Sequence, residues 1–107
     1  MKVEILHVPD CPNVAVLEQR LDEASGLAGF ARPLDVTRQV VADLDTAGAV
    51  GMTGSPTVLV DGSDPFARPG LAPSMSCRLY IDEDGGRVDA PSIDALRHAL
   101  QGGGSPS

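Results

Sequence analysis

The two residues of this chain best suited to chemistry are its cysteines, Cys11 and Cys77. Cys11 follows an apolar, strand-like run at residues 2–8 and directly precedes Pro12 and Asn13, where apolar residues begin to recur at helical spacing. The free N–H groups and the positive end of a helix stabilise a nearby negative charge, so a cysteine at this position is favoured as the thiolate. Cys11 is therefore the candidate nucleophile.

A second candidate segment is Gly54-Ser55-Pro56-Thr57, which leads into the apolar run at residues 58–60. A strand, a cysteine at a helix start and a later Pro-Thr before a strand together indicate thiol chemistry on a small α/β domain. A dithiol Cys-x-x-Cys motif would carry its second cysteine at position 14, where this chain has Val14.

Length and charge narrow the possible functions. The chain of 107 residues fits one domain, which we place at 1–101, followed by a Gly- and Ser-rich tail at 102–107 that we expect to be disordered. The net charge of −7 argues against nucleic-acid binding, which depends on Lys and Arg contacts to phosphates. No apolar run approaches the ~20 residues of a membrane span, and polar residues interrupt any signal-peptide core. We therefore expect a cytoplasmic protein that does not bind membranes.

The remaining pattern predicts strands alternating with helices. Ser92 is expected to cap the last helix, Gly26 to end the first, and Gly48 or Gly51 to end the second. The order is strand, helix, strand, helix, strand, strand, helix. The strands are expected at residues 2–8, 34–40, 58–60 and 78–81.

This order, together with the two motifs, resembles the thioredoxin-like fold over residues 2–100. Cys11-Pro12-Asn13-Val14 takes the place of the redox motif, and Gly54-Ser55-Pro56-Thr57 takes the place of the cis-proline loop. The resemblance implies a three-layer α/β sandwich around a central four-stranded mixed sheet. The chain departs from the family at Val14, which replaces the resolving cysteine, and in having no Trp before Cys11.

By this resemblance Cys11 is the catalytic nucleophile and Pro56 is a cis proline packed against it. The Ser55 backbone would be presented to an extended partner by strand addition. The implied partner is a protein disulfide or a low-molecular-weight thiol, with no cofactor and no metal. The implied substrate-binding residues are Pro12, Asn13, Ser55, Pro56 and Thr57.

Cys77 decides whether the chemistry uses one thiol or two. If a tight hairpin joined the last two strands, a rise of ~3.3 Å per residue would place Cys77 more than ~10 Å from Cys11, whereas a disulfide needs Cα atoms within ~7 Å. Residues 61–76 instead form a connection long enough to fold back over the site. Cys77 is accordingly either a second catalytic residue or a buried residue entering the fourth strand. For Arg78, the next residue, the sequence leaves three roles open: to stabilise a Cys77 thiolate, to bind an anion, or to be a solvated charge.

Two other functions stay open. Cys11 and Cys77 together suit a soft metal ion or an organomercurial, with Asp10 or Asp64 as candidate proton donors for carbon–mercury cleavage. The missing second cysteine of the dithiol motif equally fits a non-catalytic interaction module. The first of these options has its own resemblance, to small thioredoxin-like proteins labelled alkylmercury lyase-like. It rests on Asp10-Cys11-Pro12-Asn13, Asp64-Pro65-Phe66 and Ser76-Cys77-Arg78-Leu79-Tyr80.

Overall fold

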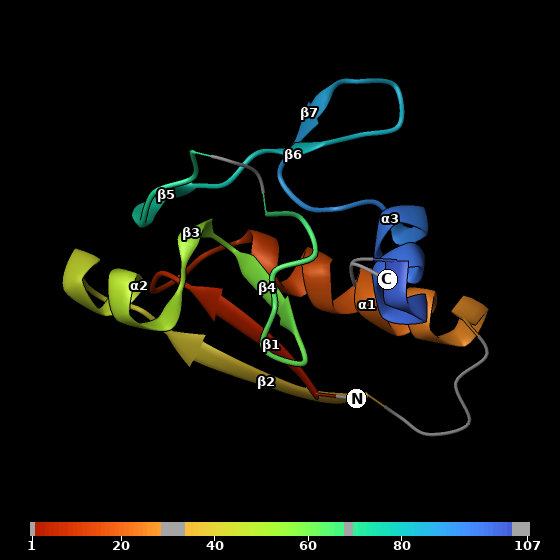
Figure 1. The fold of residues 1–107 in the computed structure, drawn as a ribbon, viewed down its shortest axis with the longest axis horizontal. Coiled ribbons are helices and arrows are strands. Elements are labelled where there is room, and N and C mark those ends of the chain that lie inside the picture. The colour runs from red at the N-terminus through yellow and green to blue at the C-terminus, as the bar shows by residue number, and fades with distance from the viewer. Residues whose placement is uncertain (1, 29–33, 68–69, 104–107) are drawn as a thin grey trace.

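The computed structural model of the chain describes residues 2–28, 34–67 and 70–103. Strands and helices alternate through the first half of the chain, as predicted, and short strands followed by a helix make up the second half (Figure 1). In chain order the elements are β1 (Lys2–His7), α1 (Asn13–Ala28), β2 (Asp35–Val40), α2 (Leu44–Val50), β3 (Thr53–Ser55), β4 (Thr57–Val60), β5 (Ser74–Cys77), β6 (Tyr80–Ile81), β7 (Arg87–Val88), α3 (Ile93–His98) and the π-helical turn η1 (Ala99–Gly103).

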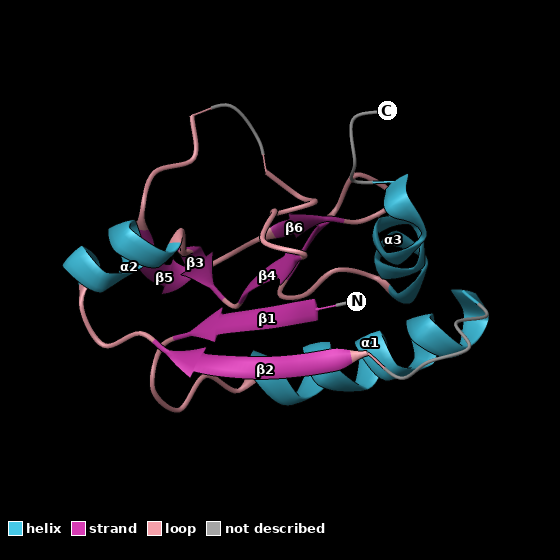
Figure 2. Cartoon of the chain, turned by 60° about the horizontal axis from the view of Figure 1, so that its bottom comes forward, coloured by secondary structure: helices cyan, strands magenta, loops and turns pink. Residues whose placement is uncertain are grey.

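The largest sheet has three strands, in the order β2-β1-β4. β1 lies in the middle, parallel to β2 and antiparallel to β4, so that Val3 stands opposite Val36 on one side and Val60 on the other. A parallel pair needs a crossover connection, which α1 provides. Figure 2 shows α1 running alongside the β1–β2 pair. The sheet is mixed, as expected.

The expected four-stranded central sheet is wrong for the described residues. The predicted fourth strand is reduced to β6, which pairs antiparallel with β7 in a separate hairpin, while β5 pairs in parallel with β3. The physical reason lies at Arg78 and Tyr80. The Arg78 N–H donates to the Ser55 carbonyl at 3.0 Å and holds the chain beside β3, and the Tyr80 hydroxyl donates to the Pro56 carbonyl at 2.5 Å. The fold is therefore an α/β globule with one three-stranded sheet and two small sheets.

Two apolar clusters cover the two faces of β1. Val3 and Ile5 pack on one face with α1 and α3, and Leu6 packs on the other with Ala47 of α2 and with Met52. Side chains of a strand alternate between faces, so a strand that is apolar at both kinds of position is buried on both sides. The first cluster comprises Val3, Ile5, Val14, Leu17, Leu21, Ala24, Val58, Leu96 and Leu100.

The predicted capping residues of α2 and α3 are confirmed. Ser92 Oγ accepts a hydrogen bond from the Ala95 N–H at 3.0 Å and caps the start of α3. Gly51 ends α2 in the left-handed conformation, with φ 87°, and its N–H donates to the Ala47 carbonyl at 3.0 Å. Gly48 lies inside the helix.

The predicted end of α1 at Gly26 is wrong, because the helix continues to Ala28. Burial of Leu21 and Ala24 anchors its last turns, which offsets the roughly 1 kcal/mol that a glycine costs inside a helix. At the other end of the chain, Gly103 closes η1, and residues 104–107 of the predicted tail lie outside the described residues. In the described ranges, none of the helices has the length and apolar character that crossing a bilayer demands.

Candidate functional site

Cys11 lies in the short connection between β1 and α1, two residues before the helix begins. Asp10 has φ 58°, a left-handed conformation that Asp adopts more readily than most residues, and its turn redirects the chain from β1 into α1. The Cys11 carbonyl accepts from the Val14 N–H at 3.5 Å. The Cys11 side chain is half-buried against the first apolar cluster. This thiol is therefore partly accessible, and its residue lies just before a helix start, where reactive cysteines are often found.

Pro12 and Asn13 flank Cys11 on the helix side. Pro12 is exposed and Asn13, partly exposed, is the first residue of α1. Val14, at the position of the missing second thiol, is buried in the first cluster. Of the predicted substrate-binding residues, only Pro12 and Asn13 thus offer side-chain surface to a molecule that approaches Cys11.

The Ser55–Pro56 peptide bond is cis, as the resemblance implied. Ser55 is only 1% exposed, and its Oγ accepts from the Val8 N–H at 3.1 Å. Thr57 follows directly and pairs with β1 as the first residue of β4. The cis-proline loop is therefore fastened to the end of β1, at a residue only three positions before Cys11.

The backbone of this loop is already hydrogen-bonded within the chain. The Ser55 carbonyl accepts from the Arg78 N–H, and the Pro56 carbonyl accepts from the Tyr80 hydroxyl. The side chains of Ser55, Pro56 and Thr57 are buried. The chain's own strand β5 thus fills the edge of β3 that the resemblance assigned to an extended partner.

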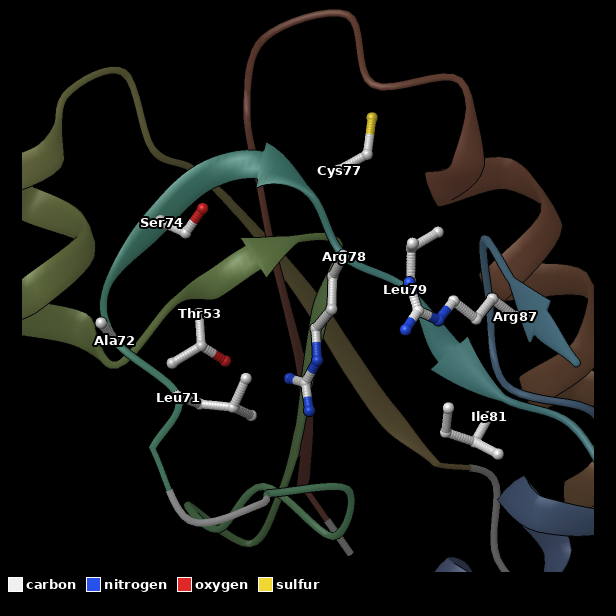
Figure 3. Close-up of a pocket in the computed structure, with 9 residues that line it drawn as sticks. All are labelled: Thr53, Leu71, Ala72, Ser74, Cys77, Arg78, Leu79, Ile81 and Arg87. Atoms are coloured by element: carbon white, nitrogen blue, oxygen red, sulfur yellow. The ribbon is translucent and has the colours of Figure 1, made fainter. Parts of the chain in front are cut away.

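Strand β5 brings Cys77 to the same loop, because Cys77 is the register partner of Ser55 in the β3–β5 pairing. Its thiol is free and exposed, so the alternative of a buried residue in a fourth strand is wrong. Figure 3 shows the thiol pointing away from the neighbouring pocket, on the side where the connection from β1 to α1 runs. The long connection before β5 therefore folds back toward the cis-proline loop.

Arg78 anchors β5, a role that the sequence did not predict. Its side chain is 3% exposed, its Nη1 donates to the Asp64 carboxylate at 2.6 Å, and its Nη2 donates to the Phe66 carbonyl at 2.8 Å. Its guanidinium also lies over the Tyr80 ring, 4.7 Å from the centroid. The charge of Arg78 is thus paired with Asp64. From the sequence we had expected Arg78 to stabilise a Cys77 thiolate, to bind an anion or to be solvated.

Tyr80 completes the anchor. Its ring meets the Phe66 ring edge to face, with centroids 5.4 Å apart, and its hydroxyl reaches the cis-proline carbonyl. Burial raises the pKa of the Tyr80 phenol well above its ordinary value of 10.0. Neither Asp64 nor Tyr80 could be paired with Arg78 from sequence spacing alone, because the contacts cross an irregular connection.

The other titratable candidates have structural partners. His7 Nδ1 lies 2.8 Å from the Val8 carbonyl, which only accepts, so this nitrogen carries the proton. Asp64, a candidate proton donor for organomercurial cleavage, accepts hydrogen bonds from Arg78 and from the Phe66 N–H. Across the part of the chain that the structure describes, no group of three or more His, Cys, Asp or Glu side chains gathers that could hold a metal ion.

Comparison of the chain with protein-family models, with curated proteins and with solved structures finds no significant match. The features that bear on function are the geometry around the two thiols and the cis-proline loop.

Proposed function

We propose that the protein is a thiol–disulfide oxidoreductase in which Cys11 is the nucleophile and Cys77 the second thiol. The proposal rests on the strand register that pairs Cys77 with Ser55. The Ser55 hydroxyl accepts a hydrogen bond from the Val8 N–H, just after β1 and three residues before Cys11. Both thiols are free and at least partly exposed, which thiol exchange requires. The cis-proline loop links the two segments that carry them.

The reaction uses only the two thiols and a disulfide substrate. The Cys11 thiolate attacks one sulfur of the substrate, the substrate S–S bond breaks, and one thiolate leaves and takes a proton from water. The Cys77 thiolate, after losing its proton to water, then attacks the Cys11 sulfur and releases the second substrate thiol. The substrate gains two electrons, and the protein is left with a Cys11–Cys77 disulfide. Two equivalents of a low-molecular-weight thiol, which are oxidised to their disulfide, would return the protein to the dithiol form.

The edge of β3 is occupied by β5, and this limits the kind of substrate that can bind. A protein partner that adds as a strand would have to displace β5, which is held by the buried Arg78–Asp64 pair. A small disulfide needs no strand addition and can approach past the exposed Pro12. We therefore favour a low-molecular-weight disulfide as substrate over a protein disulfide.

We further propose that the chain is a divergent thioredoxin-like domain. The supporting features are the strand–helix order from β1 to α2, the cysteine at the start of α1, and a cis proline before a strand antiparallel to β1. The three-stranded sheet and Val14 are its departures from that family. A cytoplasmic, reducing location is proposed with it, because both cysteines are free thiols.

A turnover assay tests the proposed activity. The wild-type chain, Cys11→Ser and Cys77→Ser are each supplied with bis(2-hydroxyethyl) disulfide as substrate and dithiothreitol as reductant. We expect Cys11→Ser to lose all catalysed reduction, because no nucleophile remains at the helix start. Cys77→Ser should keep the first step and turn over more slowly, since an external thiol must then resolve the mixed disulfide. Equal rates for the wild type and Cys11→Ser would reject the proposal.

Soft-metal capture by the same two thiols is the second candidate, and it is favoured by the same register of Cys77 with Ser55. Thiolates select soft ions such as Hg(II) and Cu(I). Tight Hg(II) binding that is lost in either single cysteine variant, together with no disulfide reduction by the wild type, would favour this function. The absence of both activities would leave the interaction module.

A further inference from the structure

A pocket of about 360 Å³ lies beside β5, and Cys77 is one of its lining residues (Figure 3). Its volume is within the range of small-molecule sites, which is about 300–1,000 Å³. Leu71, Leu79 and Ile81 supply apolar walls, and the last two are 41% and 52% exposed. Two exposed aliphatic side chains beside one pocket provide the apolar surface that a ligand could cover.

The inner wall carries two buried polar atoms that lack partners. Among the described residues, neither Thr53 Oγ1 nor Arg78 Nε has a hydrogen-bond partner. Figure 3 shows the Thr53 hydroxyl turned toward the Arg78 side chain. Leaving a buried polar atom unsatisfied costs about 1–3 kcal/mol. Both atoms lie behind the surface of the pocket, so a ligand in the pocket does not contact them.

The charge of the pocket is positive in a protein of net charge −7. The described lining residues include two arginines, Arg78 and Arg87, and no carboxylate. Arg78 is neutralised by Asp64, whereas Arg87 forms no ion pair with any residue that the structure describes. The Arg87 side chain extends from β7 toward the pocket in Figure 3. The available charge therefore favours an anionic ligand.

We propose that this pocket binds a small organic monoanion, a carboxylate with a short apolar chain. The carboxylate oxygens accept hydrogen bonds from the exposed Arg87 guanidinium. The chain lies against Leu71 and Leu79. Carboxylate oxygens accept several hydrogen bonds at once, and bonds to ionised donors are the stronger kind. The carboxylate contacts neither thiol, although Cys77 lines the same pocket.

Titration of the isotope-labelled full chain by NMR tests the site, with hexanoate as the probe and hexan-1-ol as its neutral match. We expect saturable amide shifts at Thr53, Ser74 and Arg87, and at least roughly tenfold tighter binding of hexanoate, the effect of a charge-assisted hydrogen bond. Arg87→Gln should weaken hexanoate binding by about tenfold, again by loss of that bond. The control Arg38→Gln, on β2 and paired with Glu18, should bind hexanoate as the wild type does.

Thr53→Val provides a second variant of nearly equal volume. It should bind hexanoate as the wild type does and keep its stability, because the hydroxyl that it removes is unpaired and buried behind the pocket surface. Equal affinity for hexanol and hexanoate, an unchanged affinity in Arg87→Gln, or no saturable shifts would each overturn the proposal. Cys11→Ser should bind hexanoate normally, so the outcome is independent of the disulfide assay.

Discussion

Cys77 stands opposite Ser55 in the parallel pairing of β5 with β3, and the next residue, Arg78, donates its N–H to the Ser55 carbonyl at 3.0 Å. This pairing places the Cys77 thiol, which follows a long connection, beside the loop that contains the cis proline. It also fills the edge of β3 with a strand of the same chain. The groups that hold β5 in place should therefore control both stability and thiol chemistry.

The close approach of β5 to the cis-proline loop requires a glycine at position 54. A Cβ on Gly54 would lie 2.6 Å from Arg78 Cβ and 3.0 Å from its Cα, and φ there is 122°. Gly54→Ala should therefore lower the free energy of unfolding by about 3 kcal/mol, from overpacking added to backbone strain. Gly62→Ala is the matched control, because φ is 86° but nothing lies within 4 Å of the added Cβ.

Denaturant unfolding measures both glycine variants. Gly62→Ala should cost only about 1–2 kcal/mol, the price of the left-handed backbone alone. Equal losses in the two variants would mean that β5 does not pack against Gly54 in solution.

The ion pair between Arg78 and Asp64 should be among the largest single contributors to stability. Their side chains are 3% and 13% exposed, so removing one charge leaves the other buried without its partner. We expect Asp64→Asn to lower the free energy of unfolding by about 3 kcal/mol. Asp94→Asn, which breaks the exposed pair with Arg97, should cost no more than about 1 kcal/mol.

Hydrogen exchange reports the local effect of the same substitution. Loss of the ion pair should speed exchange of the Arg78 amide, which is bonded to Ser55, before it affects amides of β1. Uniform acceleration across the chain would show that Asp64 supports the whole fold and not β5 in particular.

Tyr80 makes stability depend on alkaline pH. Burial raises the pKa of its phenol above the ordinary value of 10.0, so the folded chain keeps a proton that the unfolded chain loses above about pH 10. The resulting stability is fully present below pH 10 and is lost as the pH rises further. Urea midpoints should therefore fall more steeply above about pH 10 for the wild type than for Tyr80→Phe.

Tyr80→Phe should also cost about 1–2 kcal/mol at neutral pH, because the Pro56 carbonyl loses its donor in a buried position. A Tyr80→Phe variant with the same alkaline loss as the wild type would place the titrating group elsewhere.

The helices and the first strands could be predicted because their signals are local. Ser92 caps α3 through its own side chain, and Gly51 ends α2 through its own φ angle. The two-sided burial of β1 is likewise visible as a run of apolar residues. Gly26 shows the limit of such signals, since packing of the neighbouring turns carried α1 beyond it.

The pairing of β5 could not be predicted, because the alternation in Ser74-Met75-Ser76-Cys77 covers only four residues and its partner is distant in the sequence. Arg78 was equally difficult, since a buried arginine is understood only when its partner is known. That partner, Asp64, lies on the other side of an irregular connection. The candidate nucleophile could be named from its position before a helix, whereas the placement of the second thiol required the three-dimensional structure.

The most direct test of the account is to map the cysteines after reaction with one equivalent of 5,5′-dithiobis(2-nitrobenzoic acid). We expect the wild type to release both thionitrobenzoate groups, and peptide mass spectrometry to find an intrachain Cys11–Cys77 disulfide. Cys77→Ser should instead retain one thionitrobenzoate group, bound to Cys11. Label confined to Cys77, or stable label on both cysteines without an intrachain disulfide, would contradict the assignment of Cys11 as nucleophile and Cys77 as its partner.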